Sequence, residues 1–236
     1  MESFKNVLIV AAHPDDEVLG AGGFLSKYSH LNYRVVFLAE GTTARYSKED
    51  IDCHGAKKNI ALRRLFCINA LKNVGIKGSD IYFYDNPACR LDTVSLLELG
   101  KIVEFHISDF RPDTIITHSN VDVNIDHRTT LQAVIQATRP AKYDFVKTIL
   151  MFEILSSTEW KFIDTFKPNF FIKLNKDQIE KKANMFLQYR TESSKYPHPR
   201  SVKGIKTLAG FRGMQSGTEY AESFEILRAV MWKFYA

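Results

Sequence analysis

The chain has 236 residues, a net charge of +5, 45% hydrophobic residues and 25% charged residues. This is the composition of an ordinary folded domain, and the length predicts a single domain over residues 1–236. Lysines and arginines are scattered and form no stripe, which argues against a nucleic-acid partner but is compatible with a small, anionic substrate.

The cysteines and the N-terminus place the chain among intracellular proteins. The three cysteines are odd in number and lack CxxC spacing, which argues against a disulfide framework and against a thiolate zinc site. The apolar run near the N-terminus is too short for a signal peptide, and no stretch reaches the length of a membrane span. We therefore expect a cytoplasmic protein without a membrane span, and the sequence leaves a homo-oligomer open.

Strand and helix patterns alternate through the first 138 residues. Apolar runs predict strands at 6–12, 33–39, 81–84 and 113–118, and the segments between and after them predict helices at 15–29, 56–73, 93–110 and 127–138. The polar segment 41–55 predicts a long loop. Such alternation is typical of βαβ units with right-handed crossovers and a parallel sheet.

The pattern changes after Pro140. We expect strands within 145–155 and 169–174, a helix over 176–190, a loop over 193–204 and a C-terminal helix from about Thr218. The predicted fold class is α/β: a Rossmann-like, mostly parallel sheet flanked by helices. Its C-terminal part adds strands and helices over the active face.

Two polar clusters follow predicted strands. "HPDD" begins at His13 after the first strand, and "HSNVDVNIDH" spans residues 118–127 after the fourth. In open parallel sheets, ligands bind beyond the carboxyl ends of the strands, and these two strands are neighbours in a common doubly wound order. We therefore expect both clusters to face one crevice.

The first cluster has two interpretations. Pro14 suits the start of a helix, and the acids that follow it would be stabilised by the helix dipole. That accounts for the acids but not for His13. Because positions three apart share one side of a helical turn, His13 and Asp16 can converge, and His127 would complete a His–Asp–His set with a water. Asp15 would then be free to act as a general base.

The stretch "AAHPDDEVLGAGG" resembles the signature of the PIG-L/LmbE-like family of zinc-dependent de-N-acetylases. Further blocks resemble one branch of that family in the same order: "AEGTTAR", "RLDT", "RPDTIITH", "DVNIDHRTTLQAVIQATRP", "KPNFF", "PHPRS" and "LAGFRGMQSGTEYAESF". The resemblance implies a Rossmann-like fold and Zn²⁺, or another divalent metal, held by His13, Asp16 and His127. It implies Asp15 as general base and hydrolysis of an acetamide on an amino sugar, with release of acetate.

The chain departs from the family pattern at Asn124, at Ala88 and on the second predicted helix, where "RRLFC" has Phe66 and Cys67 in place of the acidic residue of an RxxE pattern. Asn124 stands where many members have a histidine; its amide can donate to an oxyanion but cannot be a cationic acid. The acid for the leaving amine is therefore open, and His198 in "PHPRS" is a candidate, with a plain surface histidine as the alternative. Ala88 replaces a carboxylate that the branch often has near the sugar, which allows a different sugar.

Other residues are expected around the site. Arg45 in "AEGTTAR" and Arg90 in "RLDT" are expected to bind substrate, since arginine suits anions and hydroxyls; a solvated loop charge is the alternative for Arg45. Asp126 is expected to orient His127 or a neighbouring group. Asp122 is expected to cap a turn.

The main hypothesis is a zinc-dependent N-deacetylase of an amino sugar that is free, nucleotide-linked or part of a glycoconjugate. The alternatives are an amidase that acts on a thiol–sugar conjugate and a non-catalytic carbohydrate-binding relative. The glycines of "GAGG" at 20–23 do not indicate a dinucleotide site, because Leu25 breaks the GxGxxG spacing. They are expected to let the first helix pack closely on the sheet.

Overall fold

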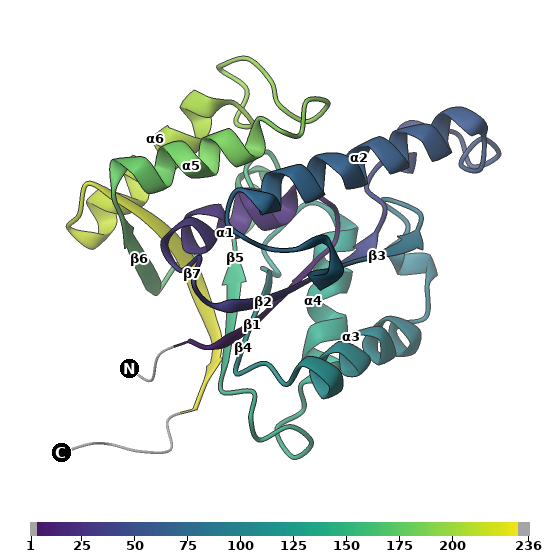
Figure 1. Ribbon diagram of the computed structural model, residues 1–236, viewed down its shortest axis with the longest axis horizontal. Coiled ribbons are helices and arrows are strands. Elements are labelled where there is room, and N and C mark those ends of the chain that lie inside the picture. The colour runs from purple at the N-terminus through teal and green to yellow at the C-terminus, as the bar shows by residue number, and fades with distance from the viewer. Residues whose placement is uncertain (1–3, 231–236) are drawn as a thin grey trace.

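Seven strands form one sheet in the order β3-β2-β1-β4-β5-β7-β6 (Figure 1). The structure is a computed structural model and describes residues 4–230. Strands β1 to β5 are parallel, and β7 runs antiparallel between β5 and β6. The strands are β1 (Asn6–Ala11), β2 (Asn32–Ala39), β3 (Ile81–Asn86), β4 (Thr114–His118), β5 (Thr148–Phe152), β6 (Phe170–Leu174) and β7 (Tyr220–Ala229).

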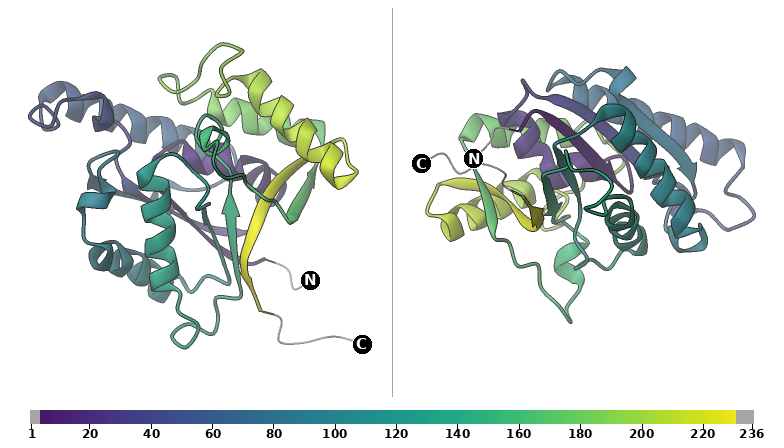
Figure 2. Two further views of the ribbon diagram at one scale, coloured as in Figure 1. Left: turned by 180° about the vertical axis from the view of Figure 1, so that it is seen from behind. Right: turned by 90° about the horizontal axis from the view of Figure 1, so that it is seen from below.

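Helices cover both faces of the sheet (Figures 1 and 2). They are α1 (Asp16–Lys27), α2 (His54–Lys72), α3 (Leu96–Phe110), α4 (Ile125–Ala137), α5 (Lys176–Phe186) and α6 (Val202–Ser216). Helices α1, α2, α5 and α6 pack on one face with Val7 and Ile9 of β1, whereas α3 and α4 pack on the other with Leu8 and Val10. Burial on both faces explains the uninterrupted apolar run of β1.

The predicted α/β fold class is confirmed. Every strand and helix expected up to residue 138 is present, with ends shifted by three residues or fewer. The strands expected after Pro140 are β5 and β6, and α5 ends at Phe186, before the predicted position. None of the helices between residues 4 and 230 combines the length and hydrophobicity that a membrane crossing needs.

The C-terminal helix expected from Thr218 is wrong, because residues Tyr220–Ala229 form β7. The apolar residues Tyr220 and Phe224 are four apart, which mimics a helical face. In the structure this segment hydrogen-bonds to β5 on one side and β6 on the other. Pairing with both strands overrides the local pattern.

The loop expected over 193–204 is also partly wrong, because α6 begins at Val202. Three glycines within this helix lower its intrinsic propensity. The helix is stabilised instead by buried Ile205 and Ala209 and by its caps. Ser201 Oγ accepts the Gly204 N–H at 2.9 Å, and Gly217 ends the helix with a φ of 71°.

The glycines of α1 let that helix lie against the sheet, as expected. A Cβ atom at Gly20 would come within 2.4 Å of the Phe152 ring, and one at Gly23 within 2.4 Å of Leu174. Side chains at these positions would push α1 away from β5 and β6. The close approach fixes the N-terminus of α1, where Asp15 is the N-cap and Asp16 and Glu17 lie in the first turn.

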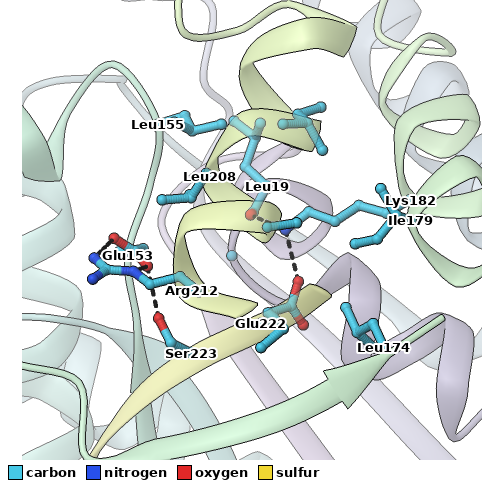
Figure 3. A pocket seen from close by; sticks show the side chains of 14 residues that line it. Leu19, Glu153, Leu155, Leu174, Ile179, Lys182, Leu208, Arg212, Glu222 and Ser223 are labelled. Atoms are coloured by element: carbon cyan, nitrogen blue, oxygen red, sulfur yellow. Dashed lines mark hydrogen bonds and ion pairs between the residues drawn. The ribbon is translucent and has the colours of Figure 1, made fainter. Parts of the chain in front are cut away.

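A buried ion pair anchors α5 and β7 to α1 (Figure 3). Lys182 Nζ donates to Glu222 Oε1 at 2.6 Å and to the Leu19 carbonyl at 2.7 Å. Glu222 in turn accepts the N–H groups of Gly23 and Phe24 at 2.9 and 2.6 Å. The C-terminal elements are thereby tied to the middle of the helix that begins at the polar cluster.

Replacing Lys182 tests this anchor. In Lys182→Met, Glu222 stays buried without its counter-charge, so we expect the free energy of unfolding to fall by about 3–5 kcal/mol. Urea denaturation followed by circular dichroism measures the change. Lys206→Met is the matched control, because Lys206 forms a more exposed pair with Glu180 and should cost less than about 1 kcal/mol. Equal losses in both variants would contradict the anchoring role.

Candidate active site

The two predicted clusters meet at the carboxyl ends of β1 and β4. These strands are adjacent and parallel, with Val7 paired to Thr114 and Ile9 to Ile116. Helix α1 leaves β1 on one face and α4 follows β4 on the other, which makes this the switch point of the sheet. Local hydrogen bonds close the turn after β1: the His13 N–H donates to Asp16 Oδ2 at 2.9 Å.

His13, Asp16 and His127 form a buried triangle. Asp16 Oδ2 lies 3.4 Å from His13 Nδ1 and 3.4 Å from His127 Nε2, and one ligand atom from each residue lies within 4.8 Å of the others. Ligands bonded at about 2.0–2.1 Å to a tetrahedral zinc lie about 3.3–3.4 Å apart. The spacing of the two contacts to Asp16 therefore suits such an ion.

Three atoms of the triangle have unused bonding capacity. Asp16 Oδ1, His127 Nδ1 and His127 Nε2 are buried, and none makes a hydrogen bond within residues 4–230, although the two ring nitrogens lie within ion-pair distance of carboxylates. A buried polar atom without a partner is costly unless something binds it. One carboxylate and two imidazoles are also a donor set that zinc accepts. The residues present therefore fit a divalent metal ion.

Each histidine of the triangle contacts a further carboxylate through the ring nitrogen that does not face Asp16. Asp126 Oδ2 lies 2.8 Å from His13 Nε2, and Asp122 Oδ2 lies 2.9 Å from His127 Nδ1. Carboxylates in this position fix the orientation and tautomer of metal-binding histidines. Asp126 thus contacts His13 and not His127. As expected, Asp122 caps a turn, because its Oδ1 accepts the Asn124 N–H at 2.8 Å. Its other oxygen, Oδ2, contacts His127.

The charges of the triangle compensate one another in the metal-free protein. Burial alone would lower the pKa of His127, but the carboxylates of Asp16 and Asp122 raise it to about 10. Burial alone would raise the pKa of Asp16, but the charge of His127 holds it well below its usual range. Without a metal, Asp16 is therefore ionised and His127 protonated at neutral pH.

His118 is a member of the site that sequence reasoning did not single out. Its Nε2 accepts the Ala12 N–H at 2.8 Å, and its ring stacks on His127 with centroids 4.0 Å apart. Burial and the charge of His127 hold the pKa of His118 well below its usual value, so the ring is neutral. The available signal was its position as the first residue of the second polar cluster.

Asp15 adopts a strained backbone conformation with φ of 129°. Such strain costs of order 1–3 kcal/mol and is typical of functional sites. Its Oδ1 lies 3.0 Å from Arg63 and its Oδ2 lies 3.0 Å from Arg200. Burial raises the pKa of Asp15 above its usual value, and the two guanidinium groups limit that rise.

Arg63, Arg200 and Glu192 are site residues that sequence reasoning missed. Arg63 reaches from the middle of α2, where it donates to the carbonyls of Pro14 and Gly41 at 2.7 and 2.6 Å. Glu192 lies 2.9 Å from Arg63 and 3.6 Å from Arg200. The block "PHPRS" contains both His198 and Arg200, and only His198 is a candidate from the sequence. The stretch "RRLFC" on α2 contains Arg63, but its only signal in the sequence was the missing acidic residue of the family pattern.

Glu17 supports Asp15 from inside the core. Glu17 Oε2 accepts the Asp15 N–H at 2.9 Å, and Oε1 accepts the hydroxyl of Tyr189, which is fully buried. Burial raises the pKa of Glu17 to about 8, although the Tyr189 hydrogen bond opposes the rise. The contacts of Glu17 hold the amide of the strained residue in place.

The two arginines expected to bind substrate lie in loops that follow β2 and β3. Arg45 contacts Glu192 at 2.8 Å and keeps 54% of its side chain exposed. Arg90 donates to the carbonyls of Thr43 and Tyr46 at 3.3 Å. Both cations therefore tie loops together in this structure, and Arg45 retains a surface on which a ligand could bind.

Asn124 and His198 each accept a hydrogen bond from a backbone N–H near the site. Asn124 is the N-cap of α4, where its Oδ1 accepts the Asp126 N–H at 2.9 Å. With its oxygen so engaged, Asn124 offers its amide N–H groups as donors. His198 Nδ1 accepts the Arg200 N–H at 3.1 Å, so His198 is linked to Asp15 through Arg200.

A family model, PIG-L, described as GlcNAc-PI de-N-acetylase, matches residues 8–138, which is more than half of the chain. The chain belongs to the PIG-L family. This confirms the resemblance on which the sequence hypothesis rests. The matched segment contains all three residues of the triangle, together with Asp15 and Arg63. A comparison with curated protein sequences found no match.

Solved structures share the fold over nearly the whole chain. An N,N'-diacetylchitobiose deacetylase from Pyrococcus horikoshii, complexed with an inhibitor, is 20% identical with a TM-score of 0.75, over 96% of this chain and 85% of the other. A deacetylase of teicoplanin biosynthesis is 16% identical with a TM-score of 0.72, over 95% and 99%. A 4-carboxy-2-hydroxymuconate hydratase from Pseudomonas putida is 20% identical with a TM-score of 0.69, over 98% and 100%. At these identities the likeness shows the fold, which serves more than one reaction.

Replacing Glu17 tests whether burial raises the pKa of its carboxyl group in the folded chain. Because its pKa is about 8 in the folded chain and about 4.3 in an unfolded one, the folded state binds more protons between these values. Stability from this group is therefore full below about pH 4 and falls as pH rises toward 8, by up to about 5 kcal/mol. Urea unfolding at pH 5 and pH 8.5 should show a smaller loss in Glu17→Gln than in the wild type.

Glu180→Gln is the control for this measurement, because Glu180 lies at the surface of α5 and should leave the wild-type loss unchanged. An equal loss in Glu17→Gln and in the wild type would show that the Glu17 carboxyl does not titrate in this range.

Proposed function

We propose that this protein is a metal-dependent hydrolase that removes the acetyl group from an N-acetylated amino sugar and releases acetate. The observation that carries the proposal is the buried triangle of His13, Asp16 and His127, in a chain of the PIG-L family. The strained, arginine-bound carboxylate of Asp15 beside it supports a hydrolytic role. Zinc is the proposed metal, because two imidazoles and a carboxylate suit it.

His13 Nδ1, Asp16 and His127 Nε2 would hold the metal, with Asp126 and Asp122 keeping the two imidazoles aligned. When bound, the ion activates water and polarises the acetyl carbonyl. Asp15 accepts the proton of the attacking water, because burial raises its pKa toward the range where a carboxylate is an effective base. Arg63 and Arg200 orient that carboxylate through one contact to each oxygen.

The later steps also use residues of this chain. Asn124 donates an amide N–H to the oxyanion that develops on the acetyl oxygen. The proton accepted by Asp15 then passes to the nitrogen of the leaving amine. His198 is the second candidate for that transfer, since its Nδ1 is occupied as an acceptor and its Nε2 is left to carry a proton.

Arg45 and Arg90 are proposed to contact the rest of the substrate, beyond the acetamide. Arg45 is the better placed of the two for an anionic group, because most of its side chain is exposed. A substrate with a phosphate or carboxylate, such as a nucleotide-linked sugar, would complement this cation. We expect the working protein in the cytoplasm.

Metal content and acetate release test the proposal. We expect about one zinc per purified chain by plasma mass spectrometry, and loss of that zinc in His13→Ala. Wild-type protein should release acetate from at least one member of a panel of N-acetyl sugars and sugar nucleotides. Asp15→Asn should keep the metal and lose about 10²–10⁴-fold in kcat, because it removes only the base.

His54→Ala is the matched control for metal content, because His54 is an exposed residue at the start of α2. It should bind metal as the wild type does. A chain that takes up no zinc when zinc is supplied would overturn the proposal. Zinc without acetate release from any sugar would refute the deacetylase and leave the carbohydrate-binding alternative.

Zinc binding should also release a proton. The metal-free protein keeps His127 protonated at pH 7, because its pKa is about 10, whereas a metal ligand must be neutral. The apparent affinity should therefore rise with pH up to about 10, with at least one proton released per zinc at pH 7, since the pKa of His13 is raised as well. Calorimetric titrations in two buffers of different ionisation enthalpy measure this number.

Asp122→Asn should release fewer protons, because Asp122 is one of the two carboxylates that raise the pKa of His127. A binding heat that does not depend on the buffer would show that His127 is already neutral before the metal binds.

A further inference from the structure

The turn between β5 and β6 is fixed to the candidate metal site. The hydroxyls of Ser157 and Thr158 both donate to Asp122, the latter at 3.0 Å. Asp122 in turn lies 2.9 Å from His127 Nδ1. Trp160 follows Thr158 by two residues on a short 3₁₀ turn, so its position is set by groups that also hold a proposed metal ligand.

The same turn is stiffened by its own hydrogen bonds. Glu159 accepts the N–H groups of Ser156 and Ser157 at 2.6 and 3.1 Å, and the Ile154 N–H donates to Thr158 Oγ1 at 2.8 Å. Ser156 has a φ of 66°, an uncommon conformation for a residue with a side chain. These hydrogen bonds fix the backbone of the turn that carries Trp160.

A second segment, residues 196–200, joins this turn to the proposed base. Arg200 NH1 lies 3.0 Å from Asp15 Oδ2, and Arg200 Nε donates to Ser156 Oγ at 2.7 Å. Its backbone N–H donates to His198 Nδ1 at 3.1 Å. The rings of Trp160 and His198 then meet edge to face, with centroids 6.2 Å apart and planes at 83°. The turn that carries Trp160 is thus linked through Asp122 to His127, and His198 is linked through Arg200 to Asp15.

Trp160 keeps 42% of its surface exposed although its backbone is fixed. A rigid indole loses little conformational entropy when a ligand packs on it, and it offers an apolar face together with one N–H donor. A pyranose ring with mostly equatorial hydroxyls has a complementary face of C–H groups. The chemistry of the two surfaces therefore matches.

We propose that Trp160, supported by His198, is the platform on which the sugar ring of the substrate packs while its acetamide reaches the His13–Asp16–His127 triangle. The proposal deepens the proposed function and rests on it for the identity of the ligand. It names the substrate class as a pyranose with an uninterrupted C–H face. A substrate without such a ring would gain nothing from the indole.

Steady-state kinetics of acetate release test the platform. With the best sugar of the panel, Trp160→Ala should raise KM about tenfold, and Trp160→Phe should raise it less because a smaller ring remains. The value of kcat should stay within about twofold and zinc content should not change, because the platform contacts no reacting atom. Phe162→Ala is the matched control, since Phe162 lies in the same loop, is 89% exposed and is expected to leave KM unchanged.

Fluorescence tests binding apart from catalysis. The chain has two tryptophans, so Trp232→Phe leaves Trp160 as the sole indole. Titration of this variant, stripped of metal, with N-acetyl-D-glucosamine should shift or quench its emission in a saturable way. The same titration of Trp160→Phe, in which Trp232 remains, measures any part of the wild-type change that does not come from Trp160.

The outcomes separate this inference from the proposed function. Acetate release with an unchanged KM in Trp160→Ala overturns the platform and leaves the hydrolase intact. A saturable fluorescence change without acetate release from any sugar supports the platform and overturns the hydrolase. No saturable fluorescence change with the sugar overturns the platform even where acetate is released. A loss of folding in Trp160→Ala would be recognised by circular dichroism, and Trp160→Phe then decides the KM comparison.

Discussion

Three consecutive carboxylates that are almost completely buried constrain this structure. Asp15, Asp16 and Glu17 are exposed by only 1%, 0% and 0%. An ionised carboxylate in a protein interior is very costly unless it is paired and hydrogen-bonded. The chain compensates each acid in a different way: Asp16 with three histidines, Asp15 with two arginines, and Glu17 with a tyrosine hydroxyl and a pKa of about 8.

The compensating groups come from elements far apart in the sequence. His127 lies on α4 and Arg63 on α2, whereas Tyr189 and Arg200 lie in the segment between α5 and α6. The C-terminal elements are therefore part of the site. The buried ion pair that ties α5 and β7 to α1 serves the same end, because it fixes the helix whose first turn carries the acids.

The separation of these groups along the sequence explains which features of the site could be predicted. His13, Asp16 and His127 follow strands or begin helices, so strand order and a spacing of three residues were enough to bring them together. Arg63 reaches the site from the middle of a helix, and its long side chain follows no periodicity that a single sequence shows. Helix α6 and strand β7 were not predicted, because long-range packing stabilises both against their local sequence patterns. Helix α6 contains three glycines, and β7 has Tyr220 and Phe224 spaced as on a helical face.

The strain at Asp15 explains how two adjacent carboxylates contact different partners. Asp16 is already helical and turns its carboxylate to the histidines, which hold its pKa low and keep it ionised as a ligand should be. Asp15, with φ of 129°, sends its carboxylate to Arg63 and Arg200, where burial raises its pKa. Neighbouring acids whose environments drive their pKa values apart are the usual arrangement of a ligand or stabiliser beside a base. A glycine would adopt this φ without strain but has no carboxylate. The strain at this position is therefore the cost of placing a carboxylate where the helix begins, and it is consistent with the proposed role of Asp15 as the base.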